Sequence, residues 1–374
     1  MTSTRALFGA LSILALGLSG CASETASKGV LKVTATDSDC ALSATSLKAG
    51  PTTFKVTNKG SKVTEFYVYG AGDHIVGEVE NIGPGLSRTL VVDLAKGMYK
   101  GTCKPGMLGD GISKKITVTG GSAKSLSDSD ALKAAAKSYS RYIEEEAGEL
   151  VEETEKFVAA VKAGKVDEAK RLYPIARTHW ERIEPVAETF GDLDPITDGR
   201  EPDVEPGDDF TGWHRIEKQL WVSDNTDGMD KYADQLLANV EEIVKRSKTA
   251  PLTALELAQG SKGLMDEVAT GKVTGEEDEF SHTDLWDFDA NIEGSMAAIN
   301  ALRPVLIKHD KALVTELDAK FKALETELDQ YKLADGSWTF YDKLTSDQVK
   351  ALSDAVAAVS EPISKVAAVV AASA

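Results

Sequence analysis

Short β-branched segments alternate apolar and polar positions between Val30 and Gly121, and turn-forming residues separate them. This period of two is typical of strands in which one face is buried, and seven or eight of them within about 90 residues indicate a β-sandwich. The sandwich is expected over residues 29–121. Its predicted strands are residues 31–36, 52–58, 64–70, 74–80, 88–94, 98–103 and 114–120.

The hydrophobic period changes after the polar segment 122–129, which we interpret as a linker. Apolar residues then recur at helical spacing, which predicts an antiparallel helical bundle over residues 130–374. Pro174 and Pro185 are expected to kink or interrupt the second helix. The stretch from about 190 to 210, rich in Pro, Asp and Gly, is predicted to be a loop. Helices are predicted from residue 130 to about 161 and at about 166–190, 210–222, 229–248, 252–269, 283–307, 310–332 and 346–372.

The first 20 residues indicate a secretory signal peptide, because Arg5 precedes an apolar run, Ala6 to Leu18, that is too short to span a membrane. The run ends in Leu18-Ser19-Gly20-Cys21, which resembles the lipobox of bacterial lipoproteins. That resemblance implies lipidation of Cys21, a tether over residues 21–28 and an extracytoplasmic protein anchored to the bacterial cell membrane. No later stretch reaches about 18 uninterrupted apolar residues, so no other membrane span is expected.

The charge is unevenly distributed along the chain. The whole sequence has 42 basic and 60 acidic residues, a net charge of −18, which excludes nucleic-acid binding as an expected function. Residues 28–121 hold 12 basic and 8 acidic residues, whereas residues 122–374 hold 29 and 51. The field of the helical part should therefore attract cations, although a merely solubilising surface has the same composition.

His214 is the one histidine of the helical part that is followed three residues later by an acidic residue, Glu217. Residues at this spacing share a helix face and can share a cation. Glu181, Glu184 and Glu188 follow Arg177 on one predicted stripe. Asp284, Asp287 and Asn291 likewise share a face of a later helix, which is expected to begin after Ser281. A histidine nitrogen among carboxylate oxygens suits iron or zinc better than calcium.

Four segments in order resemble the EfeO family of iron-uptake lipoproteins and periplasmic proteins. They are ARTHWERIEPVAETF at 176–190, GDLDPITDGR at 191–200, FTGWHRIEKQLW at 210–221 and SHTDLWDFDANIEG at 281–294. With residues 29–120, which fit the family's cupredoxin-like domain, the resemblance covers nearly the whole mature chain. It implies a multidomain fold, in which an all-β cupredoxin-like sandwich precedes an all-α imelysin-like (peptidase M75) bundle.

The same resemblance implies a non-catalytic iron-binding component of a three-part uptake system. Its partners would be a membrane iron permease, which receives the iron, and a haem peroxidase of the dye-decolorising type. The implied iron ligands are His214 and Glu217 of the His-x-x-Glu motif. Their implied companions are Glu184, Asp198 and Asp287, together with Glu181 and Asp284. Asp289 stands where glutamine is common in the family and adds a carboxylate near the site.

Tyr99 to Met107 resembles the ligand loop of blue-copper proteins, where Cys and Met flank a His, but this loop contains no histidine. The domain's only histidine, His74, lies about 30 residues earlier, so a His₂Cys copper centre cannot be assembled. Two interpretations stay open for Cys40 and Cys103. They form a disulfide, as an oxidising compartment favours, or Cys103 holds a second metal, copper or iron, with Cys40, Glu65 or Met107.

Two other functions compete with iron uptake. An imelysin-type metallopeptidase is one alternative, but the H-E-x-x-H zinc signature is absent because residues 210 and 218 are Phe and Lys. A polysaccharide- or partner-binding module with a structural metal is the other, and an aromatic content of 6% does not favour it. Zinc would serve as a surrogate for iron at the predicted site.

Overall fold

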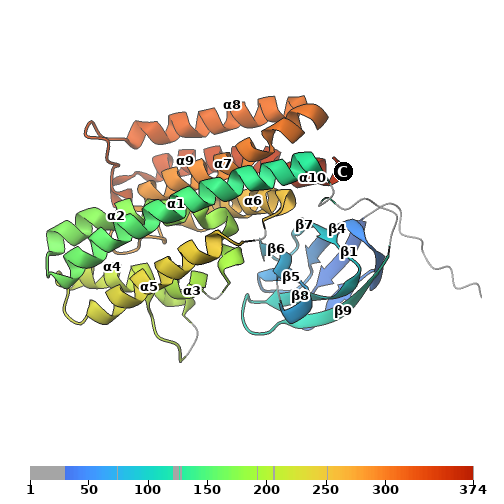
Figure 1. Cartoon of the computed structure of the whole chain (residues 1–374), viewed down its shortest axis with the longest axis horizontal. Helices are drawn as coiled ribbons and strands as arrows, with labels where there is room; N and C mark the ends of the chain where they lie inside the picture. The colour runs from blue at the N-terminus through green and yellow to red at the C-terminus, as the bar shows by residue number, and fades with distance from the viewer. Residues whose placement is uncertain are drawn as a thin grey trace, which may run out of the picture.

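The computed structural model describes residues 30–73, 75–120, 126, 129–191, 193–204, 207–250 and 252–373. It has two parts, a β-sandwich followed by a helical bundle that the sandwich meets at one end (Figure 1). The predicted architecture of an all-β part before an all-α part is therefore confirmed. The predicted signal peptide, tether, linker residues 122–125 and 127–128, His74 and the lipidation of Cys21 lie outside the described residues.

Two sheets pack face to face in the sandwich. The strands of the first sheet lie in the order β2-β1-β4-β7, and those of the second in the order β3-β9-β8-β5-β6. Inward-facing residues such as Phe54, Val56 and Phe66 are fully buried between the sheets, as the alternating pattern predicts. The bounds are β1 Val30–Ala35, β2 Cys40–Leu42, β3 Ser46–Lys48, β4 Gly50–Asn58, β5 Thr64–Tyr69, β6 Ile75–Ile82, β7 Ser87–Leu94, β8 Gly97–Pro105 and β9 Ile112–Thr119.

The bundle is built around α7, whose buried residues occur on all sides of its first turns. Helices α1, α2, α6 and α8 pack against it, and α9 packs against α6 and α8. The bounds are α1 Asp130–Lys162, α2 Val166–Ile183, α3 Leu193–Asp198, α4 Gly212–Val222, α5 Asp230–Ser247, α6 Ala254–Thr270, α7 Asp284–His309, α8 Lys311–Leu328, α9 Ser346–Ile363 and α10 Val366–Ala372.

The helix predicted at about 166–190 is interrupted near Pro185. Helix α2 continues through Pro174 but ends at Ile183, and the 3₁₀ helix η3 (Glu184–Phe190) carries Pro185. Glu184 therefore lies beyond α2 and not on its stripe. The predicted loop over 190–210 is also corrected, because it contains the short helix α3, which ends at Asp198.

The C-terminal segment Ser346–Ala372 is long and apolar enough to cross a membrane, with a mean hydropathy of 1.5 in its most apolar window. The sequence analysis expects no further membrane span, because no apolar run is uninterrupted. By length and composition alone, this segment does not support that expectation. In the structure its apolar side chains, among them Leu352, Val356 and Val370, form part of the bundle core. Packing against α6 and α8 accounts for the apolar face of this segment.

The sandwich meets the bundle through β6 and β7, which face α6 and α10 (Figure 1). The side-chain amide of Gln259 on α6 donates a hydrogen bond to the backbone oxygen of Val91 on β7. The backbone N–H of Leu126, between the two parts, donates to Asp93 Oδ2 at 2.8 Å.

Candidate metal centre

Four helices and one irregular segment bring charged side chains together inside the bundle. Helix α2 supplies Arg177 and Glu181, α4 supplies His214 and Glu217, and α7 supplies Asp284 and Asp287. Asp198 comes from the end of α3. The segment between α6 and α7 adds the remaining members, Lys272, Glu277 and Asp278.

His214 is buried, with 2% of its surface exposed, and its two ring nitrogens face different carboxylates. Nδ1 lies 2.9 Å from Glu217 Oε2, whereas Nε2 lies 3.4 Å from Asp198 Oδ1 and 3.7 Å from Glu277 Oε1. Burial and the nearby Arg177 oppose a charged imidazole. Hydrogen bonds to the three carboxylates outweigh both effects and raise the pKa of His214 well above its ordinary value.

Glu217 is fixed from two sides. Its Oε1 accepts hydrogen bonds from the backbone N–H groups of Phe280 at 3.0 Å and Ser281 at 2.7 Å, while Oε2 faces His214. The i, i+3 spacing on α4 thus places both side chains on one face, and the segment before α7 holds the carboxylate in place. Gly212 begins this helix with φ +76°, and a Cβ there would lie 2.1 Å from the backbone oxygen of Thr197.

The guanidinium of Arg177 is fully buried at the middle of the cluster. It donates to Glu181 at 2.5 Å, to Glu277 and Asp287 at 3.1 Å, and to Asp198. Asp278 Oδ1 lies 3.6 Å from its Nε. One internal cation therefore neutralises carboxylates from four separate parts of the chain.

Lys272 is the second internal cation and is only 1% exposed. Its Nζ lies 2.7 Å from Glu181 Oε2 and 2.8 Å from Glu184 Oε2. The amide nitrogen of Asn291 donates to the same two carboxylates, at 2.9 Å and 2.7 Å. Glu184 is thus engaged beside the cluster rather than among the groups around His214.

The carboxylates divide by the direction of their pKa shifts. Burial raises the pKa of Asp287 well above its usual value, even against the opposing charge of Arg177. Burial and the neighbouring Asp278 do the same for the pKa of Asp284, and burial raises the pKa of Asp278 to about 6. For Glu277, burial also opposes ionisation, but Lys272, His214 and Arg177 lower the pKa well below its usual value.

Three sets of side chains each bring three ligand atoms within 4.8 Å of one another, among the described residues. The sets are Asp198–His214–Glu277, His214–Glu217–Asp278 and Glu181–Glu277–Asp287. Each is a grouping of hard oxygens, and two of them include an imidazole nitrogen. The arrangement can therefore hold a metal cation, as the chemistry of these ligands allows.

The structure brings five of the seven sequence-predicted side chains into these sets: His214, Glu217, Asp198, Asp287 and Glu181. Glu184 and Asp284 lie next to them. The backbone N–H of Asp278 donates to Asp284 Oδ1 at 3.3 Å. The side chain of Glu188 lies outside the described residues.

Sequence reasoning missed Glu277 and Asp278, which belong to the acidic run Glu276–Glu279. The only signal in the sequence for these two residues is that the run lies shortly before a predicted helix. The run itself has no helical period, so the sequence does not indicate which way its side chains point. The buried positions of Arg177 and Lys272 were missed as well. His214 also lies in the core of the bundle.

In the sandwich, Cys40 and Cys103 form a disulfide that joins strands of the two sheets. Their sulfurs are therefore not thiolate ligands. Of the two interpretations that the sequence leaves open, the structure confirms the disulfide. Met107 is 43% exposed in a turn at φ +59°. Glu65 is buried and accepts a hydrogen bond from the hydroxyl of Tyr67 at 3.1 Å.

Comparisons with known proteins agree with both parts of the fold. The imelysin (peptidase M75) family matches residues 135–366, and the cupredoxin-like domain family matches residues 9–118. The chain is 40% identical to the iron uptake system component EfeO of Escherichia coli strain K12 over 361 residues, which is 95% of each chain. The component of the same name from Shigella flexneri matches equally. The chain therefore belongs to the EfeO family of iron uptake system components, in which a cupredoxin-like domain precedes an imelysin domain.

Proposed function

We propose that this chain binds iron in the centre of its helical bundle and delivers it to a membrane permease. The observation that carries the proposal is the convergence of His214 with buried carboxylates from four helices and the segment before α7. The names of the curated relatives support a role in iron uptake.

Unsatisfied buried oxygens support a cation at this place. Asp284 Oδ2, Asp287 Oδ1 and Asn291 Oδ1 have no hydrogen-bond partner among the described residues, and all three face the same side of α7. Buried acceptors without donors are costly, and a bound cation removes that cost. Iron binds carboxylate and imidazole ligands as Fe(II) or Fe(III), so it fits this set, with zinc as a surrogate.

The function we propose is non-catalytic. A zinc peptidase of the H-E-x-x-H type would need a second histidine one turn from His214, but residues 210 and 218 are Phe and Lys. In place of that second histidine the structure has carboxylates paired with Arg177 and Lys272. This arrangement supports holding a cation more than activating a water molecule.

We place the protein outside the cytoplasm, lipidated at Cys21, with the permease and a dye-decolorising haem peroxidase as partners in the same uptake system. The lipobox-like sequence at residues 18–21 supports the anchor. The family membership supports the partners, since the relatives are named as components of such a system.

Calorimetric titration of full-length protein with Fe(II) under anaerobic conditions, and with Zn²⁺, tests the proposal. The His214→Ala/Glu217→Ala double variant should lose at least 100-fold in affinity, because it removes ligands from two of the three sets and both imidazole contacts. His309→Ala, which removes an exposed histidine at the end of α7, is the matched control and should bind as the wild type does. Unchanged affinity in the folded double variant would refute the site.

A further inference from the structure

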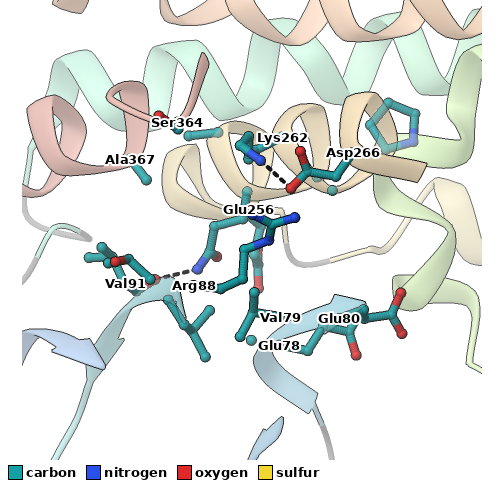
Figure 2. A pocket seen from close by; sticks show the side chains of 18 of the residues that line it. Glu78, Val79, Glu80, Arg88, Val91, Glu256, Lys262, Asp266, Ser364 and Ala367 are labelled. Atoms are coloured by element: carbon teal, nitrogen blue, oxygen red, sulfur yellow. Dashed lines mark hydrogen bonds and ion pairs between the residues drawn. The ribbon is translucent and has the colours of Figure 1, made fainter. Parts of the chain in front are cut away.

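A groove of about 420 Å³ lies where β6 and β7 of the sandwich face α6 and α10 of the bundle (Figure 2). Its volume is in the range that encloses small molecules, and such sites commonly lie between domains. Residues from both domains line the groove, and η3 contributes Pro185, Val186 and Thr189.

Arg88 is the side chain that distinguishes this groove. Figure 2 shows it extending from β7 toward α6, into the space between the domains. Its Nε is buried and has no hydrogen-bond partner, and none of the ion pairs formed by the described residues includes Arg88. Arg88 as a whole is half-buried, but a guanidinium nitrogen withdrawn from water without an acceptor is costly, so an anion bound there would be stabilised.

A second cation stands close by. Lys262 on α6 forms an ion pair with Asp266, and burial together with the nearby Arg88 lowers the pKa of Lys262. Asp266 is shared, because its other oxygen accepts a hydrogen bond from Ser360 at 2.6 Å. Lys262 thus pairs with a carboxylate that Ser360 also engages, and Arg88 lies near Lys262 with no such carboxylate partner among the described residues.

Two of the acidic side chains along the groove are held by other groups. Glu80 Oε1 accepts a hydrogen bond from the hydroxyl of Tyr67 at 3.0 Å, and burial and the nearby Glu65 raise the pKa of Glu80. Glu256 Oε2 accepts from the backbone N–H of Thr253 at 2.7 Å, in the capping box of α6. Figure 2 shows Glu78 and Glu80 on the strand side, away from the end of Arg88.

The remainder of the lining is largely apolar. Val79 and Val91 come from the strands, Val186 from η3, and Ile363 and Ala367 from the C-terminal helical segment. Gly263 on α6 leaves the groove open, because a Cβ built there meets nothing within 4 Å. A ligand for this groove needs an apolar body as well as a negative charge.

We propose that the groove binds a small organic anion, a carboxylate on an apolar body, with the carboxylate on Arg88 and Lys262 and the body against Val186, Ile363 and Ala367. This ligand would contact both domains at once. The site is separate from the metal centre, and the proposal does not depend on iron binding.

The test uses metal-free full-length protein and three probes: benzoate, its uncharged analogue benzamide, and inorganic phosphate. Ligand-detected NMR titration should show benzoate binding at least tenfold more tightly than benzamide, because charge-assisted hydrogen bonds are lost in the amide. Benzoate should also bind more tightly than phosphate, which lacks the apolar body. Arg88→Gln should weaken benzoate binding at least tenfold.

Lys55→Gln is the matched control, because it removes an exposed cation from the adjacent strand β4, and it should leave benzoate binding unchanged. Gly263→Leu gives a second variant that keeps Arg88 but fills the groove, and it should also abolish binding. Equal binding of benzoate and benzamide, or unchanged benzoate binding in Arg88→Gln or Gly263→Leu, would overturn the proposal. So would the absence of benzoate binding to the wild type. Zn²⁺ titration of the same variants separates this result from the metal centre, because Arg88→Gln should keep wild-type metal affinity.

Discussion

At the scale of single residues, Arg177 and Lys272 explain how so many carboxylates coexist inside the bundle. Arg177 contacts five of them, and Lys272 pairs with Glu181 and Glu184. Buried carboxylates without counter-ions would ionise only at a large cost. The protein's own cations therefore stabilise the metal-free state, and they would compete with the proposed metal for the same oxygens.

Arg177→Gln should destabilise the metal-free protein by about 3–5 kcal/mol, because it leaves buried carboxylates without their partner. It should also enlarge the stabilisation that saturating Zn²⁺ produces, since the metal no longer displaces an internal cation. Urea unfolding with and without Zn²⁺ measures both effects. Arg303→Gln, which removes a partly exposed ion pair with Asp318, is the control and should cost less than about 1 kcal/mol. A smaller Zn²⁺ effect in Arg177→Gln than in the wild type would contradict this competition.

The pKa shifts predict an unusual pH dependence. A carboxyl group whose pKa is higher in the folded state binds more protons there, so the free energy of unfolding falls as pH rises from its unfolded pKa to its folded pKa. Asp278, shifted from 3.8 to about 6, has this sign, as do Asp284 and Asp287. The raised pKa of His214 acts in the same direction, since its contribution is complete below 6.5 and is lost at higher pH.

Metal-free protein should therefore lose stability between pH 5 and pH 8, by about 1.4 kcal/mol per pH unit for each group that titrates in this range. Metal affinity should rise over the same range, because ligands bind the cation only when deprotonated. Urea unfolding at pH 5, 6, 7 and 8, with and without Zn²⁺, measures both slopes. Metal binding that is undiminished at pH 4 would count against this centre.

At the scale of elements, close backbone contacts set how the helices pack around the centre. A Cβ at Gly260 on α6 would lie 1.7 Å from the backbone oxygen of Pro185 in η3. A Cβ at Gly294 on α7 would lie 2.3 Å from the backbone oxygen of Arg182 on α2. Both contacts bring helices directly against the segment that carries Glu181 and Glu184.

Gly260→Ala should destabilise the bundle by several kcal/mol, because backbone must move to accept the methyl group. Gly263→Ala, on the same helix, meets open space and should be neutral or stabilising by up to about 1 kcal/mol through its helix propensity. Thermal unfolding followed by circular dichroism compares the two. Equal effects would mean that the α6–η3 contact is not tight.

The elements themselves could be predicted where a period exists. Helix α5 was expected at 229–248 and spans Asp230–Ser247, and the long strands lie where alternation predicts them. The two three-residue strands β2 and β3 were missed, because three residues show no period. Glu277 and Asp278 were not predicted either, because they lie in an irregular segment without a period. Their positions depend on how the chain between α6 and α7 folds back over His214. The i, i+3 and i, i+4 rules find side chains within one helix, and they contain no information on irregular segments.

At the scale of the whole molecule, the disulfide lies within the sandwich, so its removal tests whether the sandwich and the bundle are stabilised independently. Cys40 and Cys103 are 63 residues apart in sequence and link its two sheets. Replacing both with alanine should lower the stability of the sandwich by about 2–4 kcal/mol, mainly by relaxing the unfolded chain. Scanning calorimetry should show an earlier transition for the sandwich, while Zn²⁺ affinity at the bundle centre stays unchanged. Loss of Zn²⁺ binding would show that the sandwich is required for the centre.

The candidate ligands of the centre come from distant parts of the chain, since they lie on α2, α3, α4, α7 and the segment before α7. No short segment holds the complete set, so the nascent or unfolded chain has nothing with which to capture the ion. Zinc fingers, by contrast, fold around their metal. Here folding must come first, and its rate is set by long-range contacts rather than by metal supply. If the proposed function is correct, iron starvation would therefore leave a folded protein with an empty centre rather than an unfolded chain exposed to proteases.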